Sequence, residues 1–227
     1  MGNKAAIYHF TDKSDKRPIY YQKELARLEE FASSKGFSDF DVFVDKTLKK
    51  SQQEQLEQML EKVNDYDALI MKDFYHLRKN TGACMAELLR IGEMNIPVYT
   101  IEDGTFVFEV APFEQPLKAC IYYCGLESMG RSVELQYAIM EQFVFAKTNW
   151  TVVHKYADLD GNKVDGNQKE LQKLVQNSAD FDILLIQSYM NLHWRTSKFC
   201  KIRNAIQKGI YSMYEDIYLP YKKEEDK

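Results

Sequence analysis

One phrase occurs twice in the chain and constrains its fold more than any other feature. The stretch DYDALIMKDFYHLRKNT at residues 65–81 returns as DFDILLIQSYMNLHWRT at residues 180–196. Each copy has an Asp (Asp67 and Asp182, 115 positions apart), then a four-residue apolar run, and then a Leu and a Thr at matched places. A short run that is apolar throughout is typical of a strand buried on both faces of a parallel sheet. The chain is therefore expected to contain two copies of one sheet-forming unit.

Further matches in the same order extend the repeat over almost the whole chain. They pair residues 4–8 with 118–122, 29–31 with 141–143, Asp45 with Asp158, and 102–103 with 215–216. Their separations all fall between 112 and 115 positions. We predict two tandem units, residues 1–112 and 117–227, with the seam near Pro112 to Pro116. Each unit has about 110 residues, which is a normal size for one domain.

Strand and helix signals alternate along both units. In the first unit, strands are predicted at 5–10, 41–44, 68–71, 97–101 and 105–110, and helices at 18–32, 51–63 and 84–94. In the second unit, strands are predicted at 119–124, 150–156, 183–186 and 210–214, and helices at 133–146, 168–175 and 197–207. The segment that follows residues 68–71 is expected to be polar. This alternation predicts an α/β fold, with two doubly wound, mainly parallel sheets flanked by helices.

Composition excludes several classes of protein. The chain is 45% hydrophobic and 28% charged, which suits one or two cores under a polar surface. A net charge of −4 and a pI near 5.7 argue against unaided wrapping of nucleic acid, so DNA binding is expected to be weak or absent. No apolar run approaches the roughly 18 to 20 residues that span a bilayer, and the N-terminus lacks the pattern of a signal peptide. We therefore expect a cytoplasmic protein without a membrane segment.

No motif for a metal or cofactor stands out. The four cysteines lack C-x-x-C spacing and are expected to be buried thiols: Cys84, Cys120, Cys124 and Cys200. Residues 158–162 imitate a calcium loop, but Lys163 and Lys169 stand where such a loop needs Gly and Glu. His9 and His76 are expected near the carboxyl ends of the strands, each of them solvated. We predict no metal site and no cofactor.

The ordered signals of both units resemble those of one known family. The matching residues are Ile7-Tyr8, Gln22, Asp45, residues 67–71 and Leu77 in the first unit, and Ile121-Tyr122, Asp158, Gly166, residues 182–186 and Leu192 in the second. In this order they resemble the catalytic domain of serine recombinases, the resolvase and invertase family. The resemblance implies a resolvase-like fold for each unit and a context of DNA recombination or a mobile element.

The residues that carry the family's chemistry are not matched. In that family a Ser attacks a DNA phosphate, and several Arg side chains clamp the phosphate. The corresponding positions hold Phe10, Asp12, Tyr75, His76 and Lys79 in the first unit, and Cys124, Leu126, Met190, Asn191 and Trp194 in the second. The family's S-G-x-R-P turn and its later dimerisation helix and DNA-binding region also have no match here. The resemblance therefore implies two pseudoenzyme units that do not read a DNA sequence.

Three functions follow from these observations. The first interpretation is a non-catalytic protein that associates with a protein partner, either a recombinase or itself. An alternative is residual DNA cleavage, in which a one-residue gap lets Thr11 or Ser14 supply a hydroxyl and Lys79 supplies a phosphate cation. A second alternative is a small ligand at the strand edge. Because the connection at residues 109–117 is short and holds two prolines, the halves are expected to pack together as an intramolecular pseudo-dimer.

Overall fold

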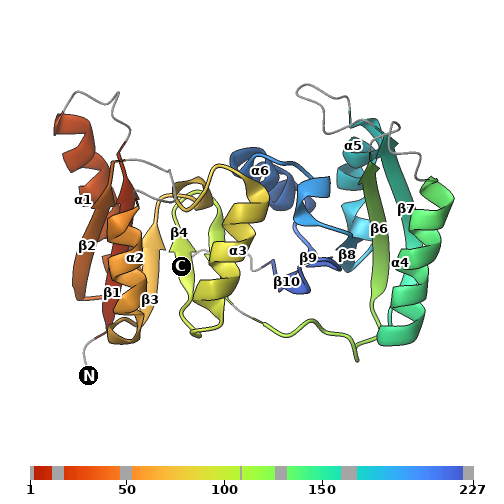
Figure 1. Cartoon of the computed structure of the whole chain (residues 1–227), viewed down its shortest axis with the longest axis horizontal. Helices are drawn as coiled ribbons and strands as arrows, with labels where there is room; N and C mark the ends of the chain where they lie inside the picture. The colour runs from red at the N-terminus through yellow and green to blue at the C-terminus, as the bar shows by residue number, and fades with distance from the viewer. Residues whose placement is uncertain are drawn as a thin grey trace. The chain divides into compact units, whose positions relative to one another are not determined.

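Two α/β units make up the chain. The computed structural model describes residues 3–11, 18–46, 53–107, 109–125, 132–159 and 168–221. The chain divides into two compact units, with the boundary between Phe108 and Glu109. Each unit is built on one five-stranded, mainly parallel sheet with helices against it (Figure 1). The α/β fold class predicted from the sequence is confirmed.

The first unit follows the predicted order of strands and helices. Its elements are β1 Lys4–Phe10, α1 Pro18–Ser34, β2 Asp39–Asp45, α2 Glu54–Glu61, η2 Val63–Asp65, β3 Ala68–Met71, η3 Phe74–His76, α3 Thr81–Gly92, β4 Val98–Thr100 and β5 Gly104–Phe106, where η marks a 3₁₀ helix. The sheet order is β2-β1-β3-β4-β5, and only β5 runs antiparallel to its neighbour. Gly36, with φ of +91°, lies just beyond the end of α1, where only a residue without Cβ adopts this backbone easily.

The second unit repeats this arrangement. Its elements are β6 Lys118–Gly125, α4 Val133–Lys147, β7 Thr151–Leu159, α5 Lys169–Gln176, η5 Ser178–Asp180, β8 Ile183–Ile186, η6 Tyr189–Asn191, α6 Thr196–Ile206, β9 Gly209–Ser212 and β10 Ile217–Leu219. The sheet order is β10-β9-β8-β6-β7, with β10 antiparallel to β9. Read from the other end, this is the order of the first sheet, with β6 in the place of β1. The sequence analysis missed β10 but found the equally short β5, because an Asp-Gly pair marks the turn before β5 and no glycine stands before β10.

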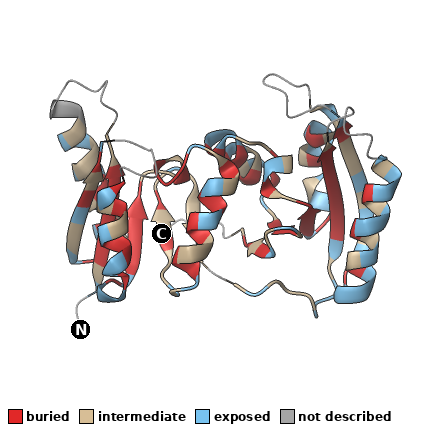
Figure 2. Cartoon of the chain, viewed as in Figure 1, coloured by how far each residue is buried: buried red, intermediate tan, exposed pale blue. Residues whose placement is uncertain are grey.

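Helices cover both faces of the first sheet. Alternate residues of a strand point to opposite sides, so the apolar central strands present apolar side chains on both faces, and each face must be buried. Ala5 and Ile7 of β1 join a core cluster with Leu28 and Ala32 of α1. Ala6, between them, lies beside residues of α2 and α3 on the other face. Figure 2 shows the central strands of both sheets buried along their length. A strand buried on both faces reads as an unbroken apolar run, which is why β3 and β8 were predicted at their observed bounds.

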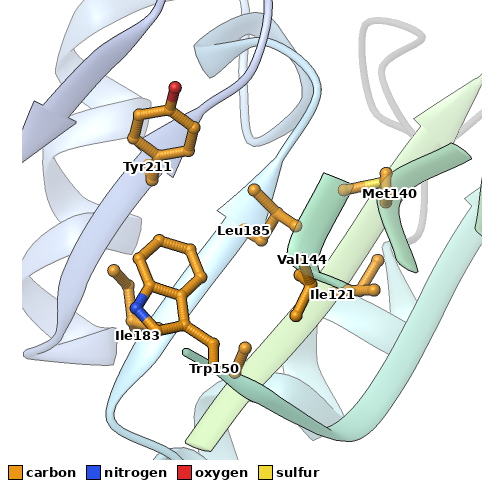
Figure 3. Close-up of a cluster of buried hydrophobic side chains, with 8 residues drawn as sticks. Ile121, Met140, Val144, Trp150, Ile183, Leu185 and Tyr211 are labelled. Atoms are coloured by element: carbon orange, nitrogen blue, oxygen red, sulfur yellow. The ribbon is translucent and has the colours of Figure 1, made fainter. Parts of the chain in front are cut away.

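The core of the second unit is richer in aromatic rings. Figure 3 shows Ile121 and Leu185 of the sheet under Met140 and Val144 of α4, with Trp150 beside them. The indole N–H of Trp150 donates to the carbonyl of Pro112 at 3.0 Å. The segment that the sequence assigned to the seam therefore packs on the second unit.

Some bounds differ from those expected. The strand predicted at 105–110 is the shorter β5, and the helix predicted from residue 51 begins at Glu54, with residues 51–52 outside the described part. Helix α3 begins at Thr81 because the side chain of Asn80 accepts a hydrogen bond from the Ala83 N–H at 3.1 Å and so caps the helix.

The expectation of a polar segment after β3 is wrong. This segment forms η3, and its Phe74 and the following Leu77 are fully buried. The error arose because the composition of this segment does not show which of its side chains the 3₁₀ turn brings into the core: Tyr75 is half-buried, while His76 is buried together with Phe74 and Leu77. Among the described residues, no helix combines the length and apolar character needed to cross a bilayer.

Candidate functional site at the carboxyl ends of the strands

A hydrogen-bond network joins the ends of β1 and β2 in the first unit. The hydroxyl of Tyr8 donates to Asp45 Oδ2 at 3.1 Å, and Gln53 Nε2 donates to the Tyr8 hydroxyl at 3.0 Å and to the Leu77 carbonyl at 3.2 Å. The Asp45 carboxylate also accepts two backbone N–H groups from the first turn of α2, both at 3.1 Å. The carboxylate thus caps α2 and holds the Tyr8 hydroxyl at once.

The same network is present in the second unit. Tyr122 donates to Asp158 Oδ2 at 3.1 Å, and Gln168 Nε2 donates to Tyr122 at 3.3 Å and to the Leu192 carbonyl at 3.1 Å. Asp158 accepts two N–H groups from the first turn of α5, at 3.1 and 2.9 Å. Burial raises the pKa of Tyr122, and that of Tyr8, well above the usual value for tyrosine, so both hydroxyls stay protonated donors.

The sequence analysis named three of the four residues of this network in each unit. It singled out the Tyr, the Asp and the Leu of each copy, but it assigned no role to Gln53 and Gln168. Their separation of 115 positions falls within the window of the other repeated pairs, so the signal was available.

Two histidines form a buried pair at the end of β1. His9 of β1 and His76 of η3 stack with ring centroids 5.5 Å apart and an interplanar angle of 28°. The expectation that each would be solvated is wrong, since they are only 5% and 7% exposed. The reason is that η3 folds back over β1 and brings His76 onto His9.

The two imidazoles of this pair have different surroundings. His76 Nδ1 lies 2.7 Å from Asp73 Oδ1, which orients the ring, whereas His9 Nδ1 is buried with no hydrogen-bond partner among the described residues. Burial lowers the pKa of His9 to about 4, and the neighbouring His76 adds to this effect. His9 is therefore neutral near pH 7.

The other family positions of the first unit make local contacts. The ring of Phe10 meets His76 edge-on at 6.1 Å, and Lys79 Nζ lies 5.7 Å from the ring of Tyr75. The backbone N–H of Thr11 donates to the Asp45 carbonyl at 2.9 Å, which fixes the main chain just beyond β1. Asp12 and Ser14 lie outside the described residues.

In the second unit, the residues matched to the active positions of serine recombinases hold the loop after β8 against β6. Asn191 donates from Nδ2 to the carbonyl of Cys124 at 2.7 Å and accepts the Ser188 N–H at Oδ1 at 2.9 Å. Cys124 is buried and Met190 is half-exposed. Trp194 carries the guanidinium of Arg195 over its ring at 4.7 Å. Leu126 lies outside the described residues.

Two arginines are buried in internal contacts that the sequence did not predict. Arg78 donates to Glu87 Oε1 at 2.5 Å and to the Leu77 carbonyl at 3.0 Å. Arg203 donates to the Pro220 carbonyl at 3.0 Å and is 1% exposed. Buried guanidinium groups engaged in this way are not presented to a phosphate in solution.

The described parts of the chain bring no group of three or more His, Cys, Asp or Glu side chains together in a way that could hold a metal ion. The four cysteines are buried as reduced thiols, as their spacing predicted. The described residues at this edge of each unit therefore supply buried hydroxyl and amide donors, their carboxylate acceptors, and ring contacts.

Comparison with known proteins gives similarity of fold only. No protein-family model matches the sequence, and no curated protein matches it significantly. The N-terminal catalytic domain of TP901-1 integrase is 21% identical over 44% of this chain and 80% of its own, with a TM-score of 0.37. The C-terminal catalytic domain of ISC1926 TnpA, an IS607-like serine recombinase, is 17% identical over 62% and 82%, with a TM-score of 0.38.

A third solved structure covers most of the chain. A LacI family transcriptional regulator from Arthrobacter sp. FB24, in complex with lactose, is 11% identical over 93% of this chain and 77% of its own, with a TM-score of 0.27. All three TM-scores lie below 0.5, so these likenesses carry no argument about function.

Proposed function

We propose that this chain is a non-catalytic protein of two tandem resolvase-like units, which acts by association with another protein in DNA recombination or in a mobile element. The observation that carries the proposal is the state of the positions where the family has its active residues. His76 is bound to Asp73 and stacked on His9, and Asn191 is bonded to Cys124 and Ser188. These side chains hold loops in place.

The framework around these positions is retained in both units, which supports a shared origin of the two copies. Tyr8, Asp45 and Gln53 make the same bonds as Tyr122, Asp158 and Gln168. Removal of one hydrogen-bond donor that stabilises the negative charge of the transition state typically slows a reaction about 100-fold to 1000-fold. Loss of every clamping Arg together with the nucleophile would leave no strand exchange.

An assay for covalent protein–DNA adducts tests the proposal. The full chain is incubated with supercoiled and nicked DNA, denatured and resolved on a gel, with an active serine recombinase as the positive control. We expect no adduct. An adduct that disappears in Thr11→Ala or Ser14→Ala would establish the alternative of residual DNA cleavage and refute the proposal.

The partner is proposed to be a recombinase or a second copy of this chain, and the two units are proposed to pack on each other as an intramolecular pseudo-dimer. Small-angle scattering of the full chain tests the second point. A distance distribution with two separate maxima would contradict it.

One observation favours a second candidate, the binding of a small ligand at the end of β1. His9 Nδ1 is a buried polar atom without a partner among the described residues, at the edge where parallel sheets bind ligands. Thermal-shift screening tests this candidate, since a ligand at 100 times its Kd stabilises a protein by about 2.7 kcal/mol. His9→Phe should abolish any such shift if the ligand contacts this nitrogen.

A further inference from the structure

Positive charge gathers on helix α6 of the second unit (Figure 1). The sequence over residues 183–214 contains five Lys and Arg and no Asp or Glu, although the whole chain carries a net charge of −4. Three of the five lie at the start of α6 or on its exposed side, and we call them the basic patch: Arg195, Lys198 and Lys201. All three are exposed, and none of them forms a salt bridge with another described residue.

Two rings hold the first cation of the basic patch in place. The guanidinium of Arg195 lies over the ring of Trp194 at 4.7 Å, and the ring of His193 lies nearly parallel to that of Trp194, with centroids 6.2 Å apart. A planar guanidinium that is held on a ring loses less freedom when it binds a carboxylate. Burial lowers the pKa of His193, and the charges of Lys198 and Arg195 lower it further, so the imidazole is neutral near pH 7.

The first unit shows that the fold does not require these cations. Helix α3 has the place of α6, with Thr81 matching Thr196 in the repeated phrase. The residues at the places of the basic patch are Asn80, Ala83 and Ala86. Asn80 caps α3 through its side chain, whereas Arg195 makes no such bond to α6. The basic patch therefore belongs to the second unit and does not serve to begin the helix.

The spacing of the two lysines favours an anionic partner. Residues three apart are neighbours on a helix surface, and like charges in such a pair disfavour the helix. Lys198 and Lys201 are in this relation, and the segment around them supplies no carboxylate to separate their charges. A ligand that places negative charge between them would relieve this repulsion.

We propose that the basic patch binds a short acidic segment of a partner protein, whose carboxylates pair with Arg195, Lys198 and Lys201. This deepens the proposed function, on which it rests, by naming the surface and the chemistry of the partner. Trp and Arg are enriched at protein–protein contacts. Trp194 is half-exposed beside the patch, so it offers apolar surface to a side chain that lies next to the carboxylates.

Two observations favour an acidic protein segment over nucleic acid. Single strands are held largely by bases that stack on aromatic rings, but the ring of Trp194 already carries Arg195. Duplex DNA is held by many cations along its length, whereas the basic patch extends about 9 Å along the helix axis and the chain as a whole is negatively charged. A short segment meets the basic patch without meeting the acidic remainder of the chain.

Fluorescence anisotropy with the full chain tests the proposal. The probes are a labelled oligoglutamate peptide, an oligoglutamine peptide of the same length, and a single-stranded oligothymidylate of the same length. We expect oligoglutamate to bind with a Kd in the micromolar range at low salt, oligothymidylate to bind more weakly, and oligoglutamine not to bind. Because the Debye length falls from about 10 Å at 0.1 M salt to about 3 Å at 1 M, the affinity for oligoglutamate should fall about tenfold over that range.

The decisive variant is Arg195→Asn, Lys198→Ala and Lys201→Ala together. It gives α6 the residues that α3 carries at the same places, so the far-UV circular dichroism and the thermal midpoint should be retained. We expect it to bind oligoglutamate about tenfold more weakly than the unaltered chain. The matched control removes the same charge from exposed positions of the first unit and should leave the affinity within about twofold. Its substitutions are Lys23→Ala, Arg27→Ala and Lys62→Ala.

A conservative exchange separates charge from helix shape. Lys198→Arg with Lys201→Arg keeps both charges and should keep the affinity. An unaltered chain that does not bind oligoglutamate, a triple variant that binds it equally well, or an equal loss in the matched control would overturn the proposal. Tighter binding of oligothymidylate through the same three residues would overturn it in favour of a nucleic acid. These outcomes do not bear on the DNA-adduct assay, so failure here is distinguishable from failure of the proposed function.

Discussion

Replacing Asp45 with Ala should destabilise the first unit strongly, because one carboxylate serves three donors. The substitution removes the acceptor for two backbone N–H groups of α2 and for the Tyr8 hydroxyl. Loss of a helix cap costs about 1 kcal/mol. A buried hydroxyl left without its acceptor costs about 1–3 kcal/mol. We expect the free energy of unfolding of the first unit to fall by roughly 2–4 kcal/mol.

Tyr8→Phe should lower the free energy of unfolding of the first unit by less than Asp45→Ala does. It removes one hydroxyl but leaves the carboxylate with its two N–H donors and leaves Gln53 bonded to Leu77. The expected loss is about 1 kcal/mol. The double variant should lose less than the sum of the two single losses, because both act on the same hydrogen bond.

The position of the tryptophans lets each unit be followed separately. Both tryptophans, Trp150 and Trp194, lie in the second unit. In urea unfolding, Asp158→Ala should shift the fluorescence transition by about 1–2 M, for a slope of roughly 2 kcal/mol/M. Asp45→Ala should shift the circular dichroism transition of the first unit and leave the fluorescence transition in place.

The control is Asp39→Ala on the same strand. The side chain of Asp39 is 67% exposed, so this substitution should change the free energy of unfolding by less than about 0.5 kcal/mol. The reasoning is wrong if Asp45→Ala costs no more than this control, or if Tyr8→Phe costs more than Asp45→Ala.

Three further outcomes are expected. The pKa of His9 is lowered from 6.5 to about 4, so its contribution to the free energy of unfolding is fully present above pH 6.5 and is lost as the pH falls toward 4. The urea midpoint of the unaltered chain should therefore fall between pH 6.5 and pH 4, and that of His9→Phe should fall less. Glu87→Ala should cost about 3 kcal/mol, because it withdraws the carboxylate from the buried guanidinium of Arg78, and equal unfolding midpoints would contradict this. Filter binding to duplex DNA should show no sequence preference, whereas nanomolar, site-dependent binding would count against the resemblance-based reading of the chain.

The order of the elements could be predicted because the central strands carry the strongest signal. Strands β3 and β8 are apolar at every position, and α1 and α4 show a helical period of apolar residues. The prediction of these elements therefore did not depend on tertiary context. Strand β10 could not be predicted in this way, since its three residues owe their conformation to pairing with β9.

The site was harder to predict than the fold. Asp45 and Asp158 were recognised by their repetition, but no local pattern shows that His76 turns back onto His9. That contact depends on η3, a short 3₁₀ helix whose direction is set by the side chain of Asp73 and the burial of Phe74. A lone histidine in the sequence looks solvated until the chain around it is folded.

The polar contacts that join α1 and α4 to their own units differ, and this has a consequence for folding. Glu24 of α1 pairs with Lys72 at 3.2 Å, whereas Gln187 donates to Gln136 of α4 at 2.5 Å at the matching place. Similar neighbouring units risk docking an element of one copy onto the other, a characteristic failure of repeat proteins. If α1 met the second sheet, Glu24 would face Gln187, and Lys72 would be left facing an amide of α4. Glu24 would then lack its counter-charge and Lys72 would keep only Glu102, 3.8 Å away, a loss that correct docking avoids. A chain with Glu24→Gln and Lys72→Gln should therefore refold with a lower yield of native protein, because this contact would then no longer distinguish α1 from α4.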